Sequence, residues 1–268
     1  MKFLATLIAA LCFNAFAAQS HEFWLSMNDY QVEPGEQIVG RLRVGSNMKG
    51  DPMLYLPEMF KRFDILEPGG RRQVKGRAGD DPAMNVPAGS DGLAVVVYES
   101  EISRVEFDDW EKFVHYVELK AFPGMPDAHL ARGLPKTGFS ESYRRFVKAL
   151  VGVGSGAGAD RPLGMYIEIV ALANPYTDDL SGGLPLQVFL KGKPRAGVQL
   201  EMYDTAPNGA TSSVKYTTDA HGVAVVRVKP GHEYLADNVV LEALPNDNPA
   251  NGSVWYSAWA SMTFRVPG

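Results

Sequence analysis

The chain has 268 residues, of which 46% are hydrophobic and 21% are charged, a composition typical of globular proteins. Its formal net charge of −5 comes without any long basic tract, which argues against nucleic acid as a partner. The only cysteine is Cys12, so the chain beyond it has neither a disulfide nor a thiolate metal site.

The first twenty residues have the pattern of a secretion signal. Lys2 is followed by an apolar run over residues 3–16, and the small-residue site Ala15-Phe16-Ala17 comes next. No later stretch approaches the roughly 20 apolar residues that a membrane-spanning helix needs. We therefore expect residues 1–20 to be a signal peptide and the mature protein to be periplasmic, with no membrane span.

The cleavage position decides the chemistry open to His21. Cleavage after Ser20 makes His21 the first residue, so that its amine and imidazole can chelate a transition metal. Cleavage after Ala18 makes it the third residue, in an arrangement that suits Cu(II) or Ni(II), whereas cleavage after Ala17 forms no tight chelate. The alternative is that His21 is only a polar lead-in to a strand.

The chain from residue 21 to about 107 is typical of short antiparallel strands. Apolar and polar residues alternate over residues 37–44, and further strands are expected at 53–56, 62–66 and 93–98. Turn signals such as Pro68-Gly69-Gly70 separate them. The pattern predicts a first β-sandwich within residues 21–151.

Two short helices are predicted after these strands, over residues 108–120 and 140–151. The first has acidic residues in its first turn and one apolar face. Ser140 is expected to cap the second helix. The apolar face of that helix is formed by Tyr143, Phe146, Val147 and Leu150. The residues expected on its solvated side are Arg144, Arg145 and Lys148.

A glycine-rich segment, residues 152–164, is predicted to link the two halves of the chain. It follows a predicted helix and lacks the Gly-Lys-Ser/Thr that a phosphate-binding loop requires. About seven strands are expected over residues 165–268, which we interpret as a second β-sandwich. The predicted fold is therefore mainly β, with two antiparallel sandwiches and two short helices inserted after the first.

Several motifs resemble known families. Residues 192–198 and 217–223 are similar to the turns of transthyretin-like and collagen-adhesin B-type sandwiches. Residues 21–266 as a whole resemble a bacterial family classed as domain of unknown function 4198. The segments that carry this resemblance are residues 21–25, 143–148, 167–170, 174–176 and 259–264. Members of that family are often labelled periplasmic components of nickel or cobalt uptake, which implies a metal-transport membrane component as partner.

Three histidines are candidate metal ligands for nickel, cobalt or copper. His21 is the central one, His115 lies in the first predicted helix, and His129 lies in a Pro/Gly-rich loop. Imidazole suits each of these metals. No His-x-His or His-Glu-x-x-His motif supports a zinc hydrolase.

Catalytic motifs are missing from the sequence, so a binding protein is expected instead of an enzyme. There is no Gly-x-Ser-x-Gly elbow and no cysteine nucleophile after the signal. Two functions stay open. One is transition-metal binding near His21, and the other is a metal-free module that contacts protein or glycan, with Trp255, Tyr256 and Trp259 as an aromatic platform.

Overall fold

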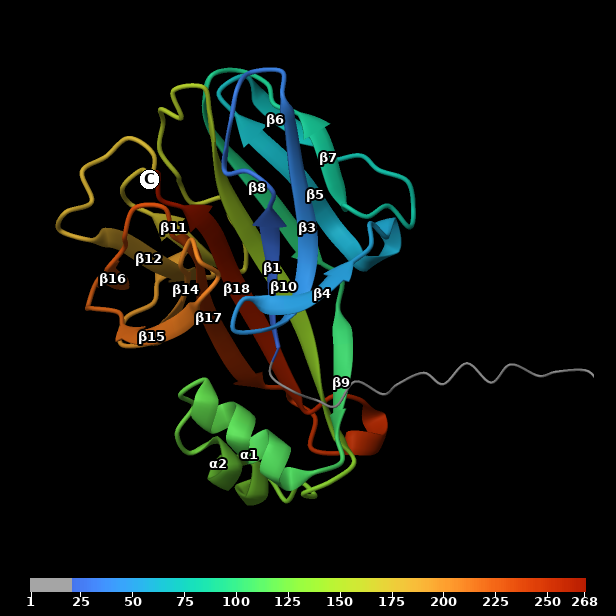
Figure 1. Ribbon diagram of the computed structural model, residues 1–268. Coiled ribbons are helices and arrows are strands. Elements are labelled where there is room, and N and C mark those ends of the chain that lie inside the picture. The colour runs from blue at the N-terminus through green and yellow to red at the C-terminus, as the bar shows by residue number, and fades with distance from the viewer. Residues whose placement is uncertain (1–20) are drawn as a thin grey trace, which may run out of the picture.

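The computed structural model describes residues 21–268, and the predicted signal peptide, residues 1–20, lies outside them. The prediction of a mainly β chain with antiparallel sheets and two short helices is confirmed. Three sheets carry the fold (Figure 1). We call them the upper sheet, the central sheet and the side sheet.

The elements have the following bounds. The upper sheet contains β1 (Glu22–Met27), β3 (Gln37–Ser46), β4 (Lys49–Met53) and β7 (Met84–Pro87). The central sheet runs in the order β15 (Thr211–Thr217), β14 (Gln199–Thr205), β17 (Glu233–Ala243), β18 (Trp255–Arg265), β10 (Phe139–Val153), β8 (Gly92–Ser100), β5 (Phe60–Glu67) and β6 (Gly70–Gln73). The short strands β2 (Gln31–Val32) and β9 (Ser103–Phe107) also pair with β10. The side sheet contains β11 (Ile167–Ala171), β12 (Leu184–Leu190), β13 (Lys193–Pro194) and β16 (Val223–Val226). The helices are α1 (Trp110–Leu119) and α2 (Met125–Ala131), with single 3₁₀ turns at η1 (Pro57–Met59) and η2 (Pro249–Asn251).

The helix predicted over residues 140–151 is wrong, because this segment forms β10, the longest strand. It pairs in parallel with β18 and antiparallel with β8 and β9, and it crosses the whole molecule (Figure 1). Phe146 and Leu150 pack into the core on one face of the central sheet, while Val147 and Val151 pack into the core on the other. A strand that is buried on both faces loses the polar/apolar alternation that identifies strands, so its apolar residues match a helical pattern by chance. Ser140 caps no helix.

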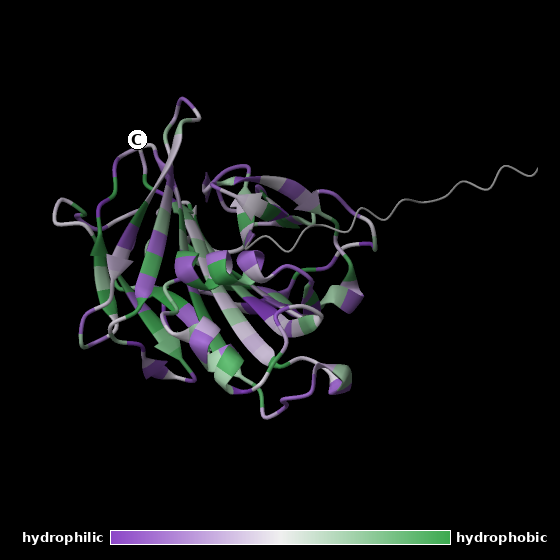
Figure 2. Ribbon diagram, turned by 90° about the horizontal axis from the view of Figure 1, so that it is seen from below, coloured by the Kyte–Doolittle hydropathy of each residue, from purple (hydrophilic) through white to green (hydrophobic). Residues whose placement is uncertain are grey.

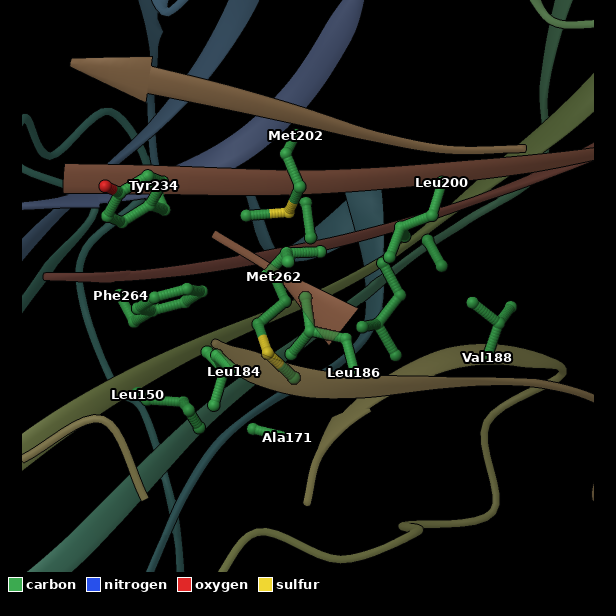
Figure 3. Close-up of a cluster of buried hydrophobic side chains, with 14 of the residues drawn as sticks. Leu150, Ala171, Leu184, Leu186, Val188, Leu200, Met202, Tyr234, Met262 and Phe264 are labelled. Atoms are coloured by element: carbon green, nitrogen blue, oxygen red, sulfur yellow. The ribbon is translucent and has the colours of Figure 1, made fainter. Parts of the chain in front are cut away.

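Two apolar cores lie on opposite faces of the central sheet. The side sheet covers one face, where Leu184 and Leu186 lie close to Met262 and Leu200 (Figure 3). The upper sheet covers part of the other face and packs against β5, β8 and β10. Burial of each large aliphatic or aromatic side chain in such cores contributes about 1.5–3 kcal/mol.

The two helices cover the remaining part of that second face, below the upper sheet (Figures 1 and 2). The helix predicted over residues 108–120 is present as α1, and the Asp109 side chain accepts a hydrogen bond from the Glu111 amide at its start. Such an N-cap satisfies one of the free N–H groups of the first turn. The second helix lies earlier than predicted, at α2.

The glycine-rich segment 152–164 is tied to the body of the protein. Its first two residues end β10, and the Asn174 amide donates to the carbonyl oxygens of Gly156 and Gly158 at 2.8 and 2.9 Å. The central sheet takes strands from both sides of this segment. The proposed division into domains 21–151 and 165–268 stays a prediction.

The free edge of the upper sheet rests on the central sheet, and this contact places the start of the described chain. Thr263 and Ser261 of β18 donate hydrogen bonds to the carbonyl oxygens of Leu25 and Phe23 of β1, each at 2.7 Å. These side chains satisfy backbone groups that an edge strand would otherwise leave unpaired. His21, directly before β1, is thereby held near β10 and β18. Within the described chain, no helix combines the length and apolarity needed to cross a membrane.

Candidate functional site

A cleft of about 840 Å³ opens between the upper sheet, the helices and the central sheet. The upper sheet contributes residues of β3 and β4, and β9 contributes Val105 and Phe107. Tyr116 of α1 and His21 also line it. Clefts of roughly 300–1,000 Å³ with apolar walls and a few convergent polar groups are the usual form of small-molecule sites.

The floor of this cleft is formed by Glu141, Tyr143 and Arg145 of β10 and by Trp259 of β18. We call these four residues the cleft floor. The three β10 residues lie two apart, so they share one face of the strand. Residues 139 and 147 of the same face are apolar and buried under the helices and the upper sheet, respectively. The polar positions therefore coincide with the gap between these two covers.

Arg145 is held by its aromatic neighbours. Its guanidinium lies 4.3 Å from the ring centre of Trp259 and 5.0 Å from that of Tyr143. Nη1 is buried and has no hydrogen-bond partner among residues 21–268. Burial lowers the pKa of Arg145 from its ordinary value, with the nearby tyrosines and carboxylates acting against that shift. The side chain stays charged at neutral pH, since arginine has an ordinary pKa above 12.

Glu141 is 2% exposed and lies at the end of a hydrogen-bonded chain. Trp259 Nε1 donates to Ser257 Oγ at 2.8 Å, and Ser257 in turn donates a short hydrogen bond to Glu141 Oε1. Burial raises the pKa of Glu141 to about 7, although the Ser257 hydrogen bond and the charge of Arg145 act in the opposite direction. Glu141 Oε2 and the Tyr116 hydroxyl are both buried, and neither makes a hydrogen bond of good geometry in the described part of the chain, although Tyr116 lies close enough to lower the pKa of Glu141.

His21 lines the same cleft at the first described residue. Burial and the charge of Arg145 lower the pKa of its imidazole. A neutral imidazole is the form that ligates metals, so this environment favours the ligating form at neutral pH.

A second group of buried charges lies behind the cleft, at the end of α1. Lys120 Nζ lies 3.0 Å from Glu22 Oε1, 2.8 Å from Asp237 Oδ2 and 3.7 Å from Glu201 Oε2. Tyr203 donates a further hydrogen bond to Glu22 Oε1 at 2.9 Å. We call these five residues the Lys120 cluster. Burial alone would lower the pKa of Lys120, but the carboxylates of Asp237 and Glu22 raise it above its ordinary value.

The other two predicted ligands lie away from the cleft. His115 is exposed on α1, and His129 is fully buried on α2. Trp255 Nε1 donates to His129 Nδ1 at 3.0 Å, and the Nε2–H of His129 is 2.9 Å from the Pro135 carbonyl oxygen. Of the three histidines, only His21 lines the cleft. Within residues 21–268, no three His, Cys, Asp or Glu side chains are grouped so that they could share a metal ion.

Sequence reasoning missed most of the cleft floor. Interpreting β10 as a helix placed Arg145 on a solvated side and gave Glu141 no role. The signal that could have revealed them is the spacing of Glu141, Tyr143 and Arg145 two apart, directly before the mostly apolar residues 146–153. Of the predicted aromatic platform, Trp259 lines the cleft, whereas Trp255 packs against Phe113 of α1 and His129 of α2.

The chain was also compared with models of known protein families. Residues 18–240 match the family described as "Domain of unknown function (DUF4198)". The chain belongs to this family. Its description names no activity or ligand, so the nickel or cobalt association of DUF4198 stays a prediction for this chain. A comparison with curated proteins finds no match.

Solved structures show only remote similarity to this DUF4198 chain. A tetra-tandem repeat in the extending region of a large adhesion protein is 11% identical, with 91% of this chain and 49% of that chain covered and a TM-score of 0.21. A Salmonella alpha-2-macroglobulin mutant is 12% identical, with 94% and 15% covered and a TM-score of 0.23. The D0-D1 domain of Intimin is 13% identical, with 90% and 97% covered and a TM-score of 0.20. The chain thus spans about half of the first structure and a small part of the second. TM-scores this low do not establish a common fold, and we draw nothing about function from them.

Proposed function

We propose that this DUF4198 protein is a non-catalytic periplasmic binding protein whose ligand occupies the cleft. The observation that carries this proposal is a coincidence of position. Three buried polar atoms without hydrogen-bond partners among residues 21–268, Glu141 Oε2, Arg145 Nη1 and Tyr116 Oη, belong to residues that line the cleft. Buried polar groups are nearly always hydrogen-bonded, and each unsatisfied one costs about 1–3 kcal/mol. These atoms are closed to solvent, so a ligand in the cleft recovers that free energy when the side chains of Glu141, Arg145 and Tyr116 turn toward it.

The proposal can be tested by filling the cleft. Val105 of β9 lines it, and its neighbour Glu106 lies on the opposite side of the strand and is exposed. Val105→Trp should abolish binding of any compound that stabilises the wild type in a thermal-shift screen of amino acids, sugars, organic acids and metal salts. Glu106→Trp, which adds the same bulk outside the cleft, should leave binding unchanged. Binding that survives in Val105→Trp, or a screen without any hit, would contradict the proposal.

A second candidate function is transition-metal binding, favoured by the position of His21 at the cleft. If cleavage follows Ser20, the new α-amino group joins the imidazole as a second nitrogen ligand there. Ni(II), Co(II) or Cu(II) would then be held for transfer to a membrane transport component.

The metal candidate has a matched pair of variants. Intact mass of the secreted protein, titrated with each metal, reads the cleavage position and the stoichiometry together. His21→Ala should abolish uptake of one metal equivalent, whereas His115→Ala, which alters an exposed histidine that does not line the cleft, should retain it. Equal uptake by both variants, or none by the wild type, would reject this candidate.

A further inference from the structure

Arg145 points to the class of ligand. We propose that the cleft binds a small organic carboxylate and that Arg145 is the residue that recognises its carboxylate group. This inference rests on the proposed binding function of the cleft and goes beyond it by naming the ligand chemistry.

The first step is the geometry of the guanidinium. Trp259 and Tyr143 lie at 4.3 and 5.0 Å from it, which is cation–π distance. Contacts of this kind use the faces of a planar guanidinium, so its N–H groups stay available at the edge, in the plane where a carboxylate forms two parallel hydrogen bonds. The two rings also restrict the side chain before the ligand arrives, which reduces the entropy lost on binding.

The second step is charge balance. The adjacent Arg144 lies 3.8 Å from the Glu99 carboxylate, whereas no ion pair joins Arg145 to any residue of the described chain. Arg145 is half-buried, and Asp237 and Glu141 act on its charge only from a longer distance, so part of its desolvation cost is not offset within the chain. An anionic ligand in contact with the guanidinium would offset that part. The Arg145 guanidinium therefore attracts a carboxylate to the cleft floor, and Lys49, which also lines the cleft, adds to the positive charge there.

The third step concerns the rest of the ligand. Glu141 Oε2 and Tyr116 Oη can exchange hydrogen bonds with a hydroxyl or amino group. With its pKa at about 7, Glu141 is largely protonated in mildly acidic solution, so it repels a bound carboxylate less than an ordinary glutamate would. Apolar contacts are available from Val44, Met53 and Phe107. These groups suit a compact hydroxy or amino acid better than a phosphate dianion.

The test compares acids with their uncharged amides. Lactate, malate, succinate and benzoate would each be titrated into wild-type protein at pH 6.5 by calorimetry, beside lactamide, malamide, succinamide and benzamide. At least one acid should bind, and its amide should bind at least about 10-fold more weakly. Arg145→Gln should weaken that acid about 10- to 100-fold, as expected for a charge-assisted pair. Arg145→Lys keeps the charge but lacks the paired N–H donors of the guanidinium, so it should give an intermediate loss of affinity. It replaces the Gln variant in this test if that variant does not fold.

A control on the neighbouring strand makes the result specific. Arg104 of β9 is exposed and lies next to Val105 but on the other side of the strand, so Arg104→Gln should change the acid affinity less than about 2-fold. If amides, or phosphate and sulfate, bind as tightly as the acids, or if Arg145→Gln binds like the wild type, the inference is overturned. The proposed function survives that outcome if a neutral compound binds and loses its binding in Val105→Trp. If none of the acids binds, the inference falls, and if nothing in the wider screen binds either, the proposed function falls with it.

Discussion

Two cations contact the ring of Trp259, and they differ in how the protein treats their charge. Lys120 Nζ lies 5.2 Å from the ring centre, and the Arg145 guanidinium lies 4.3 Å from it. Lys120 has three carboxylates of the chain within 3.7 Å, whereas Arg145 has none within ion-pair distance among residues 21–268. The charge of Lys120 is therefore balanced within the chain, although Glu22 Oε2 and Glu201 Oε2 in its cluster make no hydrogen bond among residues 21–268. The charge of Arg145 has no such close partner, which is the basis of the proposed binding role of the cleft floor.

This difference separates a structural role from a binding role. The Lys120 cluster connects the start of β1 to the end of α1 and to two strands of the central sheet. It therefore helps to fix the start of β1, directly after His21, whereas the cleft floor lines the cleft and contains buried polar atoms without partners among residues 21–268. Four variants test this separation.

The largest effect is expected for Lys120→Met. The change leaves the buried carboxylates of Glu22, Glu201 and Asp237 without a counter-charge, and breaking a buried pair in this way costs about 3–5 kcal/mol. The free energy of unfolding in urea at pH 7 measures the loss. Lys112→Met on the exposed side of α1 is the control and should change stability by less than about 0.5 kcal/mol. Equal stability of the two variants would remove the structural role from the Lys120 cluster.

The next effect concerns Glu141 and pH. Its pKa is raised to about 7 in the folded protein from an ordinary value of 4.5, so protonated Glu141 stabilises the fold at low pH. That contribution is fully present below pH 4.5 and is lost as pH rises to about 7, a change of about 3 kcal/mol at most.

Glu141→Gln keeps a neutral side chain at every pH and isolates this contribution. Urea unfolding at pH 5, 6, 7 and 8 should show the wild type losing stability relative to the variant up to about pH 7, with no further change above it. A constant difference across the series would show that Glu141 titrates normally. Groups common to both proteins, such as His21, Lys49, Asp51 and Arg145 around the cleft, cancel in this comparison.

A smaller loss is expected at His129, where the polar groups are satisfied within the chain. His129→Leu leaves the Trp255 indole N–H and the Pro135 carbonyl oxygen without their partner, which costs about 2 kcal/mol. Thermal unfolding measures this loss. His115→Leu on exposed α1 is the matched control. If His129→Leu unfolded like the wild type, the hydrogen bonds of this histidine would not stabilise the helices.

The smallest effect on stability is expected for Arg145→Gln. The variant loses cation–π contacts worth about 0.5–2 kcal/mol but also removes a buried charge without a counter-ion. The free energy of unfolding should therefore change by less than about 1 kcal/mol, in contrast to Lys120→Met. A loss above about 3 kcal/mol would show that Arg145 holds the fold together, as Lys120 does.

The sequence predicted those strands and helices whose residue pattern depends only on residues nearby in the chain. Alternation in residues 37–44 and the acidic first turn of α1 led to the correct elements, because one face of each is solvated. His21, directly before β1, lines the cleft, and its role as a metal ligand stays a prediction. β10 was missed because both of its faces are buried, a property set by distant strands and not by its own residues.

The cleft could be predicted only in part. His21 and Trp259 stood out by residue type, whereas Glu141 and Arg145 acquire meaning only when β10 passes between the upper sheet and the helices. Their pairing partners come from β18, more than a hundred residues later in the chain. Contacts between such distant positions are set by tertiary packing, which residue patterns do not report.

The most direct test of the central claim compares two ligands, an acid and its amide, in two proteins, the wild type and Arg145→Gln. The dissociation constants of one bound acid and its amide would be measured by calorimetry in wild type and in Arg145→Gln. We expect the wild type to prefer the acid by at least about 10-fold and the variant to bind acid and amide within about 2-fold of each other. An acid preference of the same size in both proteins would contradict the claim that Arg145 is left unpaired in order to bind a carboxylate.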